Sequence, residues 1–133
     1  AAEQSDRLSV PAVTEAVPLL DVLARWPASR RLYFLDETGG GVPIGDAFDD
    51  RAPASFLTGP EGGFEQTELD ALRQLPFAKA VGLGPRVLRA ETAALYALSA
   101  LQFCRSLLPM FQRPWEARLA RVPQLSVVLL LPM

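Results

Sequence analysis

Short apolar runs alternate with longer amphipathic stretches along this chain of 133 residues. The apolar runs have the length of buried strands, and three are predicted, at Leu32–Leu35, Ser55–Thr58 and Ala80–Leu83. The amphipathic stretches carry apolar residues at helical spacing, and three helices are predicted, over residues 15–26, 65–75 and 90–108. Strands that alternate with helices are typical of an α/β fold with a parallel sheet.

The remaining segments give weaker patterns. Residues 1–8 have the composition of the end of a helix, and Val10–Val13 is expected to be extended because proline disfavours helix in the residue before it. Residues 42–53 fit a loop or a short helix. The tail is interrupted by prolines and ends in the apolar run Leu125–Leu131, which fits either a strand or a disordered end.

Two of the predicted strands run directly into glycine-rich turns that precede a helix. The first turn lies in Leu57–Phe64 (LTGPEGGF) and the second in Leu83–Ala93 (LGPRVLRAETA). Glycine permits sharp bends and lets another group approach the backbone closely. In parallel sheets ligands bind at the carboxyl ends of the strands, so we predict a ligand held at that edge by backbone loops. The first turn has neither P-loop spacing nor GxGxxG spacing.

Composition narrows the chemistry further. The net charge is −2 and 50% of the residues are hydrophobic, which is typical of a soluble globular domain and not of a basic nucleic-acid-binding one. Histidine is absent and Cys104 is the one cysteine, which excludes a Cys/His zinc site and Ser-His or Cys-His catalysis within one chain. We therefore expect no metal. Neither a membrane span nor a leader is recognisable, so the expected location is the cytoplasm.

Three sequence elements together resemble one known family. They are Glu3–Arg7 with Val10–Pro11 (EQSDR and VP), Gly59–Phe64 (GPEGGF) and Leu83–Leu95 (LGPRVLRAETAAL). In this order they are similar to the carboxyl-terminal part of the ribosomal RNA small subunit methyltransferase E family, in the SPOUT superfamily, over residues 1–102. One position departs from the family's RTETA motif, because Ala90 stands where the family has threonine.

The resemblance implies a fold, a reaction and partners. The fold is an α/β domain with a carboxyl-terminal trefoil knot, the methyl donor is S-adenosylmethionine (SAM), and the assembly is a homodimer. The implied substrate is N3 of one uridine in 16S ribosomal RNA of the small ribosomal subunit. The family also has an amino-terminal RNA-binding domain. This sequence starts at Ala1 and not at Met, and Glu3–Arg7 already has a helix-like composition, so we expect a fragment. Residues 1–108 are then the carboxyl-terminal part of the methyltransferase domain, and 109–133 a tail without an assigned role.

The resemblance also implies which residues form the site. The two glycine turns would cradle the donor, and the matching positions are Leu57, Thr58, Gly59, Pro60, Glu61, Gly62, Gly63, Leu83, Gly84 and Leu88. Methylation at uracil N3 requires a proton to leave and the developing charge to be stabilised. Four side chains in the motifs are candidates for that work: Arg86, Arg89, Glu61 and Glu91.

Other roles for these side chains stay open at this point. Glu91 stands where a carboxylate favours the start of a helix, and Glu61 could brace its turn or contact a ribose. Arg86 or Arg89 could hold an RNA phosphate. The whole chain could also be a SPOUT fragment that binds SAM or dimerises without modifying RNA, or an unrelated nucleotide-binding α/β domain.

The helix predicted over residues 90–108 has a stripe of small residues, namely Ala93, Ala97, Ala100 and Cys104. Small side chains let two backbones approach closely, so we expect this stripe in the dimer interface that the resemblance implies. The same stripe would also suit packing on the chain's own sheet.

Overall fold

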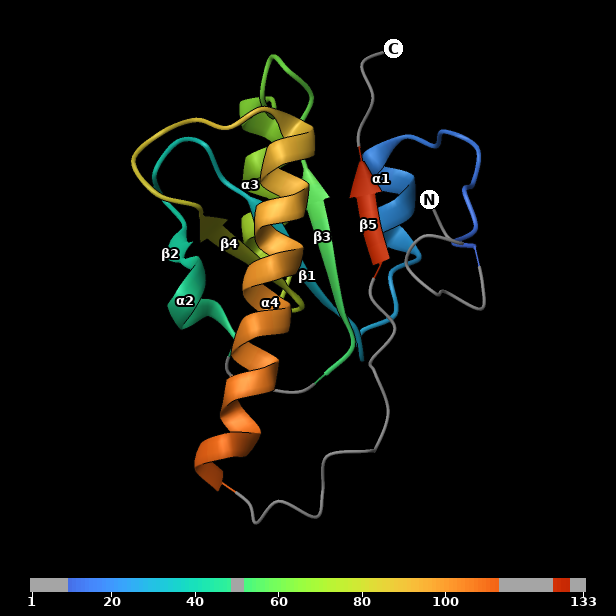
Figure 1. Ribbon diagram of the computed structural model, residues 1–133. Helices are drawn as coiled ribbons and strands as arrows, with labels where there is room; N and C mark the ends of the chain where they lie inside the picture. The colour runs from blue at the N-terminus through green and yellow to red at the C-terminus, as the bar shows by residue number, and fades with distance from the viewer. Residues whose placement is uncertain (1–9, 49–51, 113–125, 130–133) are drawn as a thin grey trace.

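A sheet of five parallel strands forms the centre of the computed structural model, which describes residues 10–48, 52–112 and 126–129. The strands are β1 (Arg31–Leu35), β2 (Val42–Pro43), β3 (Ala54–Thr58), β4 (Ala78–Gly82) and β5 (Ser126–Leu129). Their order across the sheet is β2-β4-β1-β3-β5, and each pairs in parallel with its neighbour (Figure 1). The predicted parallel α/β sheet and its three predicted strands are confirmed. From the tail, residues 126–129 pair with β3 as an edge strand.

Helices cover both faces of this sheet, as Figure 1 shows. They are α1 (Leu19–Ala24), α2 (Ile44–Ala47), α3 (Gln66–Gln74) and α4 (Ala90–Gln112). Residues of α2 and α4 pack on one face and residues of α1 and α3 on the other. The helices predicted over 65–75 and 90–108 are confirmed as α3 and α4.

The first predicted helix is too long at its amino-terminal end. We expected it over residues 15–26, but α1 begins at Leu19, directly after Pro18. Proline disfavours helical backbone in the residue before it, here Val17, so the helix cannot extend toward residue 15. The predicted helix end at residues 1–8 lies outside the described residues.

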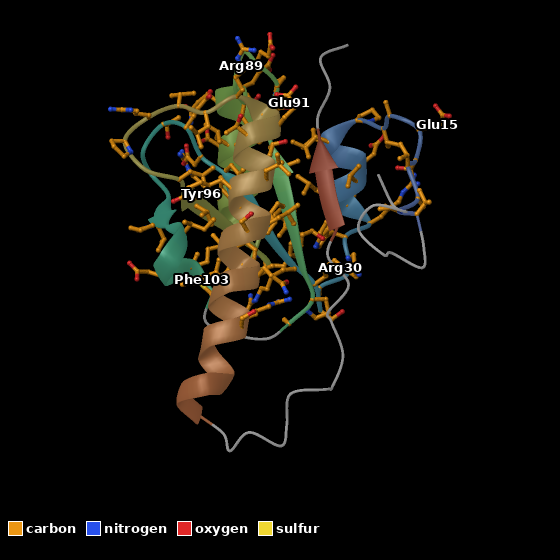
Figure 2. All side chains as sticks on the ribbon, in the orientation of Figure 1. Glu15, Arg30, Arg89, Glu91, Tyr96 and Phe103 are labelled. Carbon is orange, nitrogen blue, oxygen red and sulfur yellow. The ribbon has the colours of Figure 1, made fainter. Side chains whose placement is uncertain are left out.

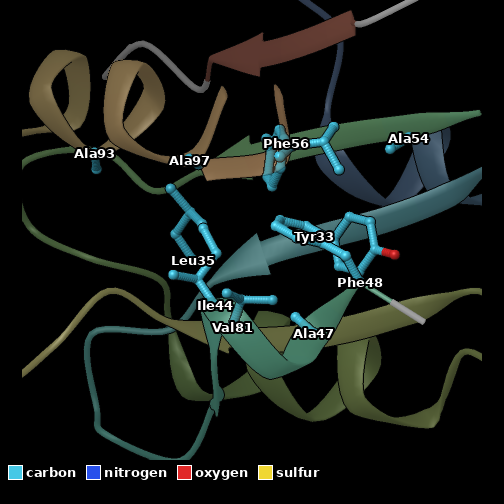
Figure 3. Packing of buried hydrophobic residues seen from close by; sticks show 11 residues of the cluster. Tyr33, Leu35, Ile44, Ala47, Phe48, Ala54, Phe56, Val81, Ala93 and Ala97 are labelled. Carbon is cyan, nitrogen blue, oxygen red and sulfur yellow. The ribbon is translucent and has the colours of Figure 1, made fainter. Parts of the chain in front are cut away.

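The hydrophobic core is divided by the sheet into two layers. On the α4 side, the rings of Tyr33, Phe48 and Phe56 lie with centroids 5.2 to 6.1 Å apart (Figure 3). On the α3 side, Phe34 and Leu57 from the strands meet Leu72 of the helix, all almost fully buried. Alternate residues of β1 therefore serve opposite layers, as the pleat of a strand requires.

A capping box determines where α3 begins. The Glu65 side chain accepts from the Glu68 backbone N–H, and the Glu65 N–H donates to Glu68 Oε2 at 2.9 Å. These bonds satisfy donors that the first turn of a helix leaves unpaired. The helix therefore starts at Gln66, three residues after Gly63, and the glycine turn that precedes it has a defined end.

The small-residue stripe of α4 packs against the chain's own core. Ala93 and Ala97 are buried there, and Ala100 and Cys104 are half-buried against the same cluster. Figure 3 shows Ala93 and Ala97 on the side of α4 that faces the strands. Our expectation that this stripe forms a dimer interface is wrong, because Ala93 and Ala97 are buried on the chain's own sheet and Ala100 and Cys104 pack against the same cluster. No helix in the described ranges is both long enough and apolar enough to cross a membrane.

Candidate functional site

Three loops leave the sheet at the same level, on the edge formed by the carboxyl ends of the strands. Phe34 of β1 is in register with Leu57 of β3, and Leu35 with Val81 of β4. The Asp36 N–H donates to the Val81 carbonyl at 2.9 Å, which continues this register one residue further. Both predicted glycine turns therefore lie on one edge, and the loop after β1 lies between them in the strand order.

A cavity of about 800 Å³ opens at this edge. Its lining comes from the loop after β1, the turn after β3, the loop after β4 and the first turn of α4. Apolar side chains such as Leu35, Leu88 and Ala93 share the wall with charged ones. A volume of this size and a mixed lining are typical of pockets for small organic ligands and cofactors.

Most of the predicted site residues meet in this cavity. The lining includes Thr58, Gly59, Pro60, Glu61, Gly63, Leu83, Gly84, Arg86, Leu88 and Arg89. Three predicted residues lie outside it. Leu57 is buried in the core on the α3 side, Gly62 is exposed at the tip of its turn, and Glu91 is exposed on the first turn of α4.

The loop after β1 supplies a third wall that sequence reasoning missed. Asp36, Glu37, Thr38, Gly39 and Gly41 all line the cavity, and none of them is among the site residues predicted from the motifs. A signal was available, because this glycine-rich segment follows a strand of the same predicted parallel sheet. Every such segment ends at the ligand-binding edge.

Gly41 shows why the missed loop needs glycine. A Cβ atom built there would lie 2.5 to 2.8 Å from the backbone of Val81 and Gly82. Real Cβ atoms do not approach backbone so closely, so any other residue would push the loop away from β4. Glycine at this position lets Val42 and Pro43 follow at once as β2, paired with Val81 and Gly82.

Asp36 anchors the same loop from the opposite side. Its side chain is fully buried and accepts from Arg73 Nη2 of α3 at 2.9 Å. It also accepts from the backbone N–H of Thr38 at 2.9 Å and from the Thr38 hydroxyl. Burial by itself would raise the pKa of Asp36, but the hydrogen bonds from Thr38 and Arg73 and the Arg73 charge together lower it below its usual 3.8. Asp36 is therefore ionised at neutral pH.

The other charged residues of the cavity are exposed. Glu37 and Glu61 belong to the loops after β1 and β3, and Arg86 and Arg89 belong to the loop after β4. Figure 2 shows Arg89 together with Glu91 at the amino-terminal end of α4, the end of the molecule toward which β3 points. The cavity thus joins two acidic loops to one basic loop.

The Thr58 hydroxyl is the clearest unused hydrogen-bonding group at the site. Thr58 is the last residue of β3, it lines the cavity, and it is 1% exposed. Its Oγ1 atom has no hydrogen-bond partner within the described part of the chain. Since buried hydroxyl groups are nearly always paired in native proteins, this one is suited to a bound ligand.

The described residues do not meet the requirements of a metal site. Over residues 10–48, 52–112 and 126–129, no group of three or more acidic, cysteine or histidine side chains could hold a metal ion. The polar groups of the cavity are thus amides, a hydroxyl, carboxylates and guanidinium groups, which suit an organic ligand with several polar centres.

Residues 1–102 match the family model described as an RNA methyltransferase domain. Because the match covers most of the chain, the protein belongs to the RNA methyltransferase domain family, as its motifs predicted.

Within that family its relatives are proteins named ribosomal RNA small subunit methyltransferase E. The relative from Rickettsia conorii (strain ATCC VR-613 / Malish 7) is 32% identical over 109 residues, 80% of this chain and 44% of its own length. The relative from Bacillus subtilis (strain 168) is 35% identical over 115 residues, 81% of this chain and 44% of its own length. The relative from Aquifex aeolicus (strain VF5) is 36% identical over 101 residues, with coverages of 76% and 42%. The chain thus spans less than half the length of these relatives.

Proposed function

We propose that this chain forms the donor-binding part of a SAM-dependent methyltransferase that acts on N3 of a uridine in 16S ribosomal RNA. One observation carries the proposal. In a member of the RNA methyltransferase domain family, the loops that contain the GPEGG and LGPRVLR motifs line one cavity at the carboxyl edge of a parallel sheet. A ribosomal RNA substrate is in keeping with the names of the relatives, and it would place the protein in the cytoplasm.

The residues of the cavity fit SAM chemically. Leu35, Leu83 and Leu88 offer apolar surface for an adenine ring, and the unpaired Thr58 hydroxyl offers a hydrogen bond. Backbone amides of the glycine turns can pair with polar edges of the ligand without adding bulk. Bound in this cavity, SAM would supply a methyl group on a positively charged sulfur. The protein's contribution would be mainly to orient the donor and the RNA base.

The charged side chains of the cavity supply what methylation of a uracil nitrogen requires. The N3 proton must leave, and negative charge spreads onto the uracil oxygens as it does so. Arg86 and Arg89 would stabilise that charge from the loop after β4, and Glu61 is the motif carboxylate in the lining that could accept the proton. Glu91 lies outside the lining on the first turn of α4, where its negative charge interacts favourably with the positive end of the helix dipole.

The SPOUT-type trefoil knot is part of the same proposal. The parallel sheet and the two loops at its carboxyl edge support it, since these are the loops that the knot would use to cradle the donor. An experimental backbone trace without threading through residues 57–90 would contradict the knot while leaving the methyl-transfer proposal standing.

Transfer of a labelled methyl group tests the proposed reaction. We expect the protein, purified in its full natural length, to move label from SAM to small ribosomal subunits or their 16S RNA. Mass spectrometry of RNA fragments should then find N3-methyluridine. SAM binding without any transfer would instead support the non-catalytic SPOUT alternative, and methylation of a different atom would correct the target.

A variant that blocks the cavity tests whether the methyl-transfer activity depends on this site. Ala90 is half-buried and lines the cavity, so Ala90→Trp would fill space that the donor needs. Ala71→Trp is the matched control, since Ala71 is a half-buried alanine of α3 outside the lining. Transfer and SAM binding should be lost in the first variant and retained in the second.

A homodimer is also part of the proposal, through a different surface of α4 from the one predicted. Leu95, Tyr96 and Phe103 are apolar, lie on α4 and are 67%, 48% and 65% exposed. Tyr96 and Phe103 are two helical turns apart, so they lie on the same side of α4 (Figure 2). An exposed apolar face of this kind is typical of a protein–protein contact.

We expect Phe103→Glu to weaken the dimer at least about tenfold, because a buried aromatic anchor would become a buried charge. Sedimentation of the full natural-length protein across micromolar concentrations measures this change. Val13→Glu is the control, since Val13 is an exposed apolar residue outside α4. A wild-type protein that sediments as a monomer, or equal dimer affinity in both variants, would contradict this interface.

A further inference from the structure

Glu37 connects two of the loops that form the cavity. It follows the buried Asp36 at the end of β1, its side chain is exposed, and it lines the cavity. Its carboxylate lies against the Cα atom of Gly63, in the space that a side chain at residue 63 would occupy. Gly63 also has a positive φ of 78°, which favours glycine at this position, and the Glu37 carboxylate occupies the space that a Cβ atom would need.

The charge of Glu37 is not compensated, in contrast to that of its neighbour. Asp36 has Arg73 and Thr38 as partners. Within the described part of the chain, Glu37 forms no ion pair, and the same holds for Glu61 on the facing turn. The walls formed by the loops after β1 and β3 thus present two unpaired carboxylates.

The charge distribution gives the cavity two electrically different sides. The arginines that line it, Arg86 and Arg89, are both on the loop after β4. The positive group of a ligand is therefore expected to bind on the side of the cavity that contains Glu37. A polyanion is expected to bind on the side that contains the two arginines. The unpaired Thr58 hydroxyl, at the end of β3 between these loops, is independent evidence that a polar ligand completes the site.

From this arrangement we infer that Glu37 is a specificity-determining residue that recognises the positive charge of the methyl donor. The inference rests on the proposed function. SAM carries one positive charge more than S-adenosylhomocysteine, which remains after transfer, and the two molecules otherwise share their groups. A carboxylate near that charge strengthens binding of the donor and not of the product. Glu37 thereby favours exchange of spent product for fresh donor.

Calorimetry with both ligands tests this role. In the full natural-length protein, Glu37→Gln should weaken SAM binding about fivefold, because one partly solvated charge pair at close range is lost. The affinity for S-adenosylhomocysteine should change less than about twofold, so the ratio of the two affinities should fall. Added salt should lower the ratio in the wild type more than in the variant.

Glu15→Gln is the matched control, since it removes the same charge at an exposed residue outside the cavity lining, in the segment before α1 (Figure 2). Equal weakening of both ligands by Glu37→Gln would mean that Glu37 only shapes the loops, and would overturn the inference. An unchanged ratio in a protein that binds SAM would also overturn it and leave the proposed function intact. A wild type that binds neither ligand would overturn both.

Discussion

Single-turnover methyl transfer by Arg89→Ala or Arg86→Ala protein is expected to be slower by on the order of 100-fold. In the proposed reaction, negative charge develops on uracil as its N3 proton leaves, and these two side chains are the cations in the lining of the cavity. Neither a lysine nor a histidine takes part in that lining. The measurement is transfer of labelled methyl groups by enzyme in excess over RNA. Arg25→Ala, at an exposed arginine outside the lining, is the control.

The dependence on RNA concentration separates the two roles that an arginine could have. A rate that stays low at saturating RNA indicates charge stabilisation in the reacting complex. A rate that recovers at high RNA indicates a phosphate contact that contributes to binding alone. If both single variants transfer methyl groups within about twofold of the wild type, neither arginine has the proposed catalytic role.

Asp36→Asn should destabilise the protein by about 2 kcal/mol at neutral pH, because the charge-assisted hydrogen bonds of a fully buried carboxylate are weakened. This loss of stability is moderate because the Arg73 side chain is 39% exposed and water can replace part of its interaction with Asp36. Urea unfolding over a series of pH values measures the effect. Asp21→Asn, at an exposed aspartate of α1, is the control.

The direction of the pH dependence follows from the lowered pKa of Asp36. A carboxyl group whose pKa is lower in the folded state stabilises that state fully above the unfolded pKa. Its contribution disappears as the pH falls through the lowered, folded pKa. The difference in unfolding free energy between wild type and Asp36→Asn should therefore be constant above about pH 5 and shrink below pH 3.8. A difference that grows on acidification would contradict the network that we describe.

Local patterns along the chain were sufficient to predict much of this fold. The strands β1 and β3 and the helices α3 and α4 follow from the period of apolar residues, which a single segment expresses without its neighbours. The two glycine turns were predicted to share an edge because every parallel strand ends on the same side. The late start of α1 was also readable from Pro18, and that signal was overlooked.

Other features depend on groups that are far apart in the sequence. Arg73 reaches Asp36 across 37 positions, and Gly41 rests on the backbone of Val81 and Gly82. No local pattern shows that these residues meet, so the contacts that hold the third wall of the cavity in place could not be predicted. The contact between Glu37 and Gly63 belongs to the same class.

By itself the sequence determined the parallel α/β class, the glycine-rich turns at the carboxyl edge of the sheet and, through its motifs, membership of the RNA methyltransferase domain family. Short segments are sufficient to determine these properties, because the period of apolar residues and the position of glycine act on the local backbone. Only the tertiary structure decided that the small stripe of α4 faces the chain's own sheet, and that the loop after β1 completes the cavity. The reason is physical. The strand order β2-β4-β1-β3-β5 determines which apolar face of a helix becomes buried and which loops become neighbours. Strand order is a property of the whole folded chain.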